Sequence, residues 1–251
     1  MNFSLLLVVA IFLISWLLTM VGLGGGLIFS LLFVILGFPK TEAASASLFL
    51  NLIAAGSAAY TYSRKKMVDF SLSIPLIVSS SLSAPAGSYL NVRIDLKPFL
   101  MIMAVVLALA GIRMLLSPAA ETETAGLEPW KKIFAGIGIG VCIGLMGGML
   151  GIGGGVFVVP LPIYILKTPT KIAAASSTFI VCFSSFTGFL GYASMEKINW
   201  WFILPAAVAS FAGGQAGSRI MSTRLKRRSI RVIFSIVLFV LCAKLVHQYF
   251  S

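Results

Sequence analysis

Charge is scarce in this sequence. Only 10% of the 251 residues are charged, against about 25% in an average soluble domain. Every acidic residue lies in or next to a predicted loop, and the complete set is Glu42, Asp69, Asp95, Glu121, Glu123, Glu128 and Glu196. Cation and proton pumps usually place a carboxylate inside a membrane span. The absence of one argues against a pump of that kind.

Catalytic and cofactor-binding motifs are also missing. The single histidine, His247, is close to the end of the sequence, which argues against a serine–histidine dyad protease. No zinc-protease motif or phosphate-loop motif occurs, so we expect neither an enzyme nor ATP hydrolysis. The three cysteines, Cys142, Cys182 and Cys242, lie in apolar segments without metal-ligand spacing and are interpreted as small buried apolar residues. No bound cofactor is expected.

Apolar residues dominate what is present. They make up 59% of the chain, and residues 2–39 and 133–166 contain no charge. Runs near ~20 residues are long enough for a helix to span a bilayer. The sequence therefore predicts an all-α, polytopic transmembrane protein. Its formal charge of +12 is attributed to basic loops and not to nucleic-acid binding.

Two halves of the sequence match each other. The glycine cluster Gly22–Gly26 recurs as Gly151–Gly155, 129 residues later. At a nearly constant offset, further residues of the first half match the second: Pro39 with Pro169, Ala43–Ser47 with Ala173–Ser177, Tyr62 with Tyr192, and Pro75 with Pro205. We interpret the chain as a duplication, with repeats at 1–118 and 129–251 joined by a loop at 119–128.

Each half is predicted to begin with a helix that glycine interrupts. Long helices at 3–21 and 131–149 run into the glycines, and short segments at 26–37 and 155–166 leave them. A dozen residues are too few to cross a core about 30 Å thick, so each pair can form a V-shaped hairpin with the glycines at its tip. Further spans are expected at 43–63, 71–91, 97–116, 172–193, 200–222 and 229–248. Eight spans with two hairpins, or ten spans, both fit the sequence.

Basic residues predict that the two repeats are inverted. If Arg64–Lys66 is cytoplasmic, alternate crossing puts 14 basic residues inside and five outside. The five are Lys40, Arg93, Lys97, Lys197 and Lys244. Positive loops favour the cytoplasm, so we predict a protein of the plasma or inner membrane with both termini outside. The basic run Arg224–Arg231 is expected to contact anionic lipid headgroups.

The paired pattern of a G-x-G-G-G cluster, a short apolar segment, a proline and an Ala/Ser-rich helix start resembles the sulfite exporter TauE/SafE family of membrane permeases. It is carried by Gly22–Gly26 with Pro39–Ser47 and by Gly151–Gly155 with Pro169–Ser177, and the resemblance covers nearly the whole chain. The resemblance implies transport of sulfur oxyanions or organosulfonates such as sulfite, sulfoacetate or thiosulfate.

Neutral donors are what the sequence offers for an anion inside the membrane. Unpaired backbone N–H groups at a helix start carry partial positive charge, and glycine lets a ligand approach them. We expect helix starts at the glycine clusters and after Pro39 and Pro169, four in all, to converge near the midplane. The candidate binding residues are Gly24, Gly25, Gly26, Ser45, Ser47, Asn51, Gly153, Gly154, Gly155, Ser176, Ser177 and Gln215, with Thr178 as a further hydroxyl.

Other interpretations of the same residues stay open. Glycine clusters and Ala/Ser stretches also serve close packing between membrane helices, and Asn51 could bridge two helices. The alternatives to an anion carrier are an inverted-repeat exporter of neutral or amphipathic metabolites, as in the drug/metabolite superfamily, and a membrane scaffold that transports nothing. The oligomeric state is left open by the sequence.

Overall fold

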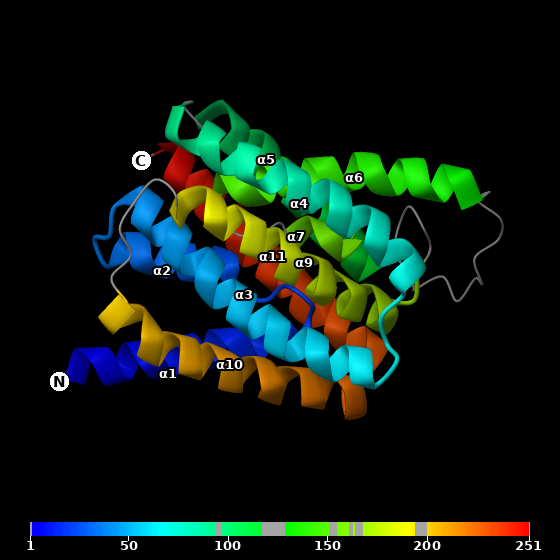
Figure 1. Cartoon of the computed structure of the whole chain (residues 1–251), viewed down its shortest axis with the longest axis horizontal. Coiled ribbons are helices and arrows are strands. Elements are labelled where there is room, and N and C mark those ends of the chain that lie inside the picture. Colours follow the sequence, from blue (N-terminus) through cyan, green and yellow to red (C-terminus); the bar gives the residue numbers. More distant parts are fainter. Residues whose placement is uncertain are drawn as a thin grey trace.

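The computed structural model describes residues 2–93, 97–116, 129–150, 155–160, 163, 168–193 and 200–250 (Figure 1). Within these ranges the chain is nearly all helical and contains no strand. The first half holds α1 (Asn2–Met20), α2 (Gly26–Ile35), α3 (Lys40–Arg64), α4 (Phe70–Arg93) and α5 (Lys97–Leu116). The second holds α6 (Pro129–Leu150), α7 (Gly155–Val158), α9 (Thr170–Ala193), α10 (Trp200–Thr223) and α11 (Arg227–Phe250).

The prediction of an all-α, polytopic membrane protein is confirmed. Three helical segments are long and apolar enough to cross a membrane, as judged on the described residues: Thr41–Arg64, Phe70–Leu90 and Thr170–Ala193. Leu5–Met20 and Gly136–Met149 are shorter apolar helices. The long helices match their predicted limits within a few residues. The second short segment was predicted over 155–166, but its described helix ends at Val158, and residues 161–162 and 164–167 lie outside the described part.

The helix packing repeats between the two halves. The helix α1 packs on α10, and its counterpart α6 packs on α4; α3 packs on α10, and its counterpart α9 packs on α4. Buried tyrosines at equivalent positions make equivalent hydrogen bonds. The Tyr62 hydroxyl donates to the Thr19 carbonyl (2.8 Å), and the Tyr192 hydroxyl donates to the Gly148 carbonyl (3.0 Å). Helices of one half therefore pack mainly against helices of the other, and the predicted linker 119–128 lies outside the described residues.

The repeats have opposite directions. The helices α3 and α9 cross as an antiparallel pair, because Leu48 lies against Gly188, Asn51 against Ser185, and Gly56 against Cys182. In contrast, α1 and α3 both run parallel to α10, while α6 and α9 both run parallel to α4 (Figure 1). Such halves are related by a two-fold rotation about an axis perpendicular to the helices. This is the inverted-repeat arrangement.

Small residues bring the paired helices close together. Along α6, Gly140, Gly144 and Gly148 recur every four residues and lie on the backbone of α4, where a Cβ would overlap its carbonyl groups or serine hydroxyls. Gly213 and Gly217 of α10 make the same kind of contact with α1. In lipid the hydrophobic effect does not hold helices together, so their association depends on close packing and short polar contacts, which these glycines allow.

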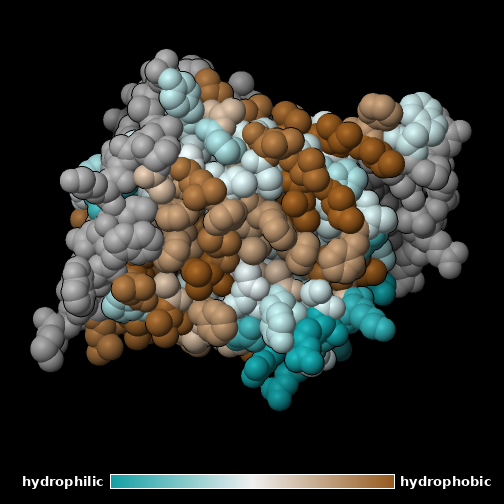
Figure 2. All heavy atoms as spheres, viewed as in Figure 1, coloured by the Kyte–Doolittle hydropathy of each residue, from teal (hydrophilic) through white to brown (hydrophobic). Residues whose placement is uncertain are grey.

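The first glycine cluster turns the chain back on itself. Because α1 and α3 run in the same direction, α2 between them must run back toward the face of the bundle where α1 begins. The N-terminus of α2 lies beside Asn51, near the middle of the 25-residue helix α3. The pair α1 and α2 is therefore a hairpin whose tip, Val21–Gly25, lies inside the helix bundle, and we refer to this segment as the first tip. Figure 2 shows apolar side chains over much of the surface and hydrophilic ones gathered at one end.

Candidate functional site

Glycine makes the sharp turn of the first tip possible. Gly22 and Gly24 have φ angles of +87° and +81°, in the left-handed region that other residues rarely adopt. The amide of Leu23 reaches back to the Leu18 carbonyl (3.0 Å), which ends α1. All of Val21–Gly26 is buried. A buried, unwound segment of this kind is tolerated at membrane depth only inside protein or along a cavity.

Asn51 holds the start of α2 in place. Its Oδ1 accepts the N–H of Gly26 (2.9 Å), and its Nδ2 donates to the Ser185 hydroxyl (2.8 Å). Both side chains are fully buried. The Oδ1 atom also lies against Gly24, which leaves no room there for a side chain. One amide therefore joins the first tip to α3 of its own half and to α9 of the other half.

Ser177 fixes the other end of the first tip. Its buried hydroxyl lies within hydrogen-bond distance of the carbonyls of Gly22 (2.9 Å) and Ala174 (2.8 Å). A Cβ on Gly22 would stand 2.5 Å from the Ala174 carbonyl oxygen and 2.8 Å from its Cα. The approach of the tip to α9 thus depends on glycine for space as well as for its φ angle.

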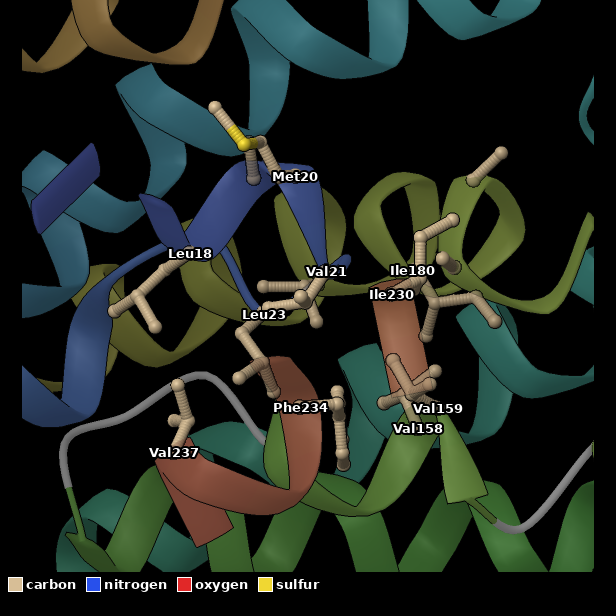
Figure 3. Packing of buried hydrophobic residues seen from close by; sticks show 14 of the residues in the cluster. Leu18, Met20, Val21, Leu23, Val158, Val159, Ile180, Ile230, Phe234 and Val237 are labelled. Atoms are coloured by element: carbon tan, nitrogen blue, oxygen red, sulfur yellow. The ribbon is translucent and has the colours of Figure 1, made fainter. Parts of the chain in front are cut away.

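The first tip meets Gly155, the last residue of the second glycine cluster, inside the molecule. A Cβ on Gly155, the first residue of α7, would lie 2.6 Å from the carbonyl oxygen of Leu23 in the first tip. Apolar side chains surround this meeting point: Leu18, Val21 and Leu23 cluster with Val158, Val159 and Phe234 (Figure 3). Gly153 and Gly154 lie outside the described residues. Among the described residues, no three His, Cys, Asp or Glu side chains gather as a metal site.

The start of α2 offers backbone donors to an acceptor. The first amide of α2 to bind a carbonyl one turn earlier is that of Phe29, which donates to Gly25 (3.1 Å). The N–H groups of Leu27 and Ile28 therefore precede the helical ladder, as in any first turn. No acidic side chain lies in this turn. The positive end of the helix dipole faces the interior, and the oxygen of Asn51 already binds there.

The remaining predicted residues have other surroundings. Ser47 donates to the Ala44 carbonyl and Thr178 to the Ala174 carbonyl, both within their own helix. The Ser45 hydroxyl is buried without a partner. Ser176 accepts the amide N–H of Asp69 (2.9 Å) and so binds the loop after α3. Gly25 packs against the ring of Phe29.

Gln215 lies between α3 and α10. Its Nε2 donates to the Ser57 carbonyl (2.8 Å), and its Oε1 accepts the Thr61 hydroxyl (3.2 Å). Ser57 and Thr61 are two to three turns beyond Asn51 along α3, so this amide bridges two helices away from the first tip.

The predicted convergence of four helix starts is wrong for the two long helices. Because α3 and α9 are antiparallel and cross near Asn51 and Ser185, their N-termini lie at opposite faces of the bundle. Only the starts of α2 and α7, the two helices that follow the glycine clusters, lie together in the interior. The sequence could not separate these cases, since it carries no distance between helix ends.

Several hydroxyls that bridge helices were not among the predicted residues. Ser185 is the partner of Asn51, and the pair Ser15 and Ser210 links α1 to α10 (3.1 Å), with Ser210 also donating to the Leu50 carbonyl (2.7 Å). The only signal in the sequence was a serine on an apolar helix. That signal is weak, since most serines here bind a carbonyl of their own helix.

Apolar helices in two inverted halves, with a glycine-broken tip that meets the start of α7 in the interior, define a polytopic membrane protein built like the inverted-repeat carriers. The chain belongs to the sulfite exporter TauE/SafE family, whose family model matches residues 7–245. It is a membrane-embedded protein of a transporter family.

Curated relatives span most of the chain. It is 25% identical over 254 residues to the probable membrane transporter protein YunE of Bacillus subtilis, covering 92% of each. A probable membrane transporter protein of Sinorhizobium fredii is 27% identical over 246 residues, covering 95% of this chain and 96% of its own length. One from Xylella fastidiosa is 27% identical over 187 residues, covering 73% and 67%. No solved structure matches the chain.

Proposed function

We propose that this protein is a secondary transporter of small anions, namely sulfur oxyanions or organosulfonates such as sulfite, sulfoacetate or thiosulfate. The family description, sulfite exporter, supports the sulfur chemistry. The start of α2 supports the charge of the substrate, because it presents backbone N–H groups and no carboxylate. No cofactor and no covalent chemistry enter this proposal.

The contact between Asn51 and Gly26 carries the proposal. A side-chain oxygen accepts the first N–H of α2 in the buried interior (2.9 Å), so this position binds an oxygen acceptor. An oxyanion oxygen is a stronger acceptor than an amide oxygen, because hydrogen bonds to charged groups are shorter and about twice as strong. The substrate would bind the first turn of α2, with the buried hydroxyl of Ser177 beside the same tip.

Alternating access follows from the inverted halves. The first hairpin enters the bundle from one face, and in the inverted second half the hairpin of α6 and α7 would enter from the other. Movement of one hairpin tip away from the other would open the central site to one face at a time. A site of neutral donors suits this cycle, because the bound anion must also leave.

The basic face is proposed to be cytoplasmic. The Lys65 ammonium donates to the Ser222 hydroxyl (2.7 Å), so the ends of α3 and α10 lie together and bring exposed basic residues to one face. These are Arg64, Lys65, Lys66, Arg219, Arg224, Lys226, Arg227 and Arg228. Figure 2 shows hydrophilic side chains gathered at the lower right. We place this face in the cytoplasm of a plasma or inner membrane, against anionic headgroups, with both termini outside.

Counterflow of labelled sulfite in proteoliposomes tests the function. We expect uptake driven by internal unlabelled sulfite, competition by thiosulfate and sulfoacetate, and no effect of an organic cation. Transport of a cation or a neutral metabolite with no response to any of these anions would favour an exporter of the drug/metabolite kind. Absence of all transport from folded protein would favour a scaffold.

A further inference from the structure

The two long helices that follow a proline differ at their first turns. In α3 the sequence after Pro39 is Lys40, Thr41, Glu42, so an acidic side chain lies in the first turn. At the equivalent positions α9 has Thr170, Lys171, Ile172 and no acid. A carboxylate in the first turn compensates the positive end of the helix dipole. The partial positive charge at the helix N-terminus is therefore compensated in α3 and uncompensated in α9.

Thr170 adds a second, independent observation. Its side chain is only 1% exposed, and its hydroxyl has no hydrogen-bond partner. Later hydroxyls of the helix bind the carbonyl three or four residues earlier, as Ser177 and Thr178 bind Ala174. Thr170 is the first residue of α9, so no carbonyl of this helix precedes it, and its Cα–Cβ bond tilts toward the N-terminal end of the helix. Buried polar atoms without partners are rare and call for a ligand or another explanation.

Several donors therefore gather at this helix start. The first amide with a carbonyl partner is that of Ala173, which donates to Pro169 (2.9 Å). The N–H groups of Lys171 and Ile172 precede the helical ladder. The half-buried Lys171 adds a positive charge in the same turn. Hydroxyl, backbone amides and ammonium together suit an oxyanion with several acceptor oxygens.

The start of α9 lies on the basic face. Ser176, in the second turn of α9, accepts the amide of Asp69 in the loop after α3, and the same loop carries the exposed Lys65 and Lys66. The Asp69 carboxylate is already bound at the start of α4, where its Oδ1 accepts the N–H of Ser71 (3.1 Å) and of Leu72 (3.3 Å).

We propose that the first turn of α9 is a second oxyanion site, which loads the substrate from the basic face. Thr170 and the amides of Lys171 and Ile172 bind the anion, and the Lys171 ammonium attracts it. The start of α3 at the opposite face has no such site, since Glu42 repels an anion and the Thr41 side chain is only half-buried. The two faces of the carrier therefore differ in affinity. The inference rests on the proposed anion transport.

Equilibrium binding of labelled sulfite to the full chain in nanodiscs tests the second site. Wild type is expected to bind two anions per chain. Thr170→Val removes the unpartnered hydroxyl but keeps the shape, and Ile172→Glu installs the acid found in α3. We expect each variant to weaken one of the two sites about tenfold or more, because a charged hydrogen bond or a nearby like charge is involved. Thr187→Val, which loses a hydroxyl that bonds only carbonyls of the same helix, should keep both sites.

Thermal unfolding separates binding from folding. Since the Thr170 hydroxyl makes no hydrogen bond, Thr170→Val should leave the ligand-free protein at least as stable as wild type, and it should reduce only the stabilisation by sulfite. One site per chain in wild type with active counterflow would overturn the second site and leave the transport function standing. Two sites unchanged in both variants would overturn it as well. If wild type showed no sulfite binding and no counterflow, the proposed function itself would be refuted.

Discussion

Asn51→Val is the sharpest perturbation of the first tip. The substitution removes the acceptor for the Gly26 amide (2.9 Å) and the donor to Ser185 (2.8 Å) in a fully buried environment. Valine is a natural choice, because Val181 occupies the equivalent position in α9. We expect the helices to form as before, because valine is apolar and of similar size, while the start of α2 loses its attachment to α3 and α9.

The magnitude follows from the two bonds lost. Side-chain hydrogen bonds between membrane helices average about 0.6 kcal/mol and reach about 1.7 kcal/mol. Two of them give about 1–3 kcal/mol, near 2 kcal/mol when the Gly26 amide is left unpaired in the interior. A loss of about 2 kcal/mol, at about 1.4 kcal/mol per factor of ten, lowers the equilibrium constant for holding the tip in place roughly 30-fold. Counterflow should fall by at least about tenfold.

Asn51→Asp is the matched variant, since it keeps the shape and the acceptor for Gly26, while the Ser185 hydroxyl, which accepts from Asn51, can donate to the new carboxylate. A carboxylate at the start of α2 is stabilised by the helix dipole, so the unfolding temperature should stay close to that of wild type. An ionised carboxylate about 5 Å from a bound anion repels it by about 3 kcal/mol at an effective dielectric constant of about 20. Sulfite binding to the central site should therefore weaken by roughly 100-fold.

Thermal unfolding in nanodiscs and sulfite counterflow measure both variants. The expected pattern is a destabilised Asn51→Val and a stable but inactive Asn51→Asp. If Asn51→Val matched wild type in both measurements, Asn51 would not hold the tip. Normal counterflow by Asn51→Asp would refute an anion site at the start of α2.

Three further changes test the fold and its orientation. Gly22→Ala should destabilise the protein by clearly more than Gly37→Ala, because both have positive φ (+87° and +86°) but only Gly22 lies against another backbone, that of α9; equal losses on thermal unfolding would contradict this packing. Tyr62→Phe should cost about 0.5–1.5 kcal/mol of stability through its lost bond to α1, and an unchanged unfolding curve would show that the bond contributes nothing. Cysteines replacing Lys65 and Lys226 should both react with an impermeant reagent from the cytoplasmic side, and labelling from opposite sides would refute the single basic face.

Patterns within the sequence determined the helices and their equivalence. Uncharged runs fix where helices can span a membrane, because each buried charge is expensive there. The offset near 130 residues fixed which elements correspond, and the structure places Tyr62 and Tyr192 in equivalent bonds. The glycine clusters predicted the hairpin, since positive φ at Gly22 and Gly24 needs residues without a Cβ.

The tertiary structure decided which helix ends meet. Periodicity gives the faces of a helix but no distance between helices, so the sequence alone allowed all four helix starts to meet. In the structure, the antiparallel crossing of α3 and α9 puts the starts of these two helices at opposite faces of the bundle. Asn51 was visible as a polar residue in an apolar span, but its partners Gly26 and Ser185 lie 25 and 134 residues away. Such pairings arise only when close glycine contacts fix how the two inverted halves pack against each other.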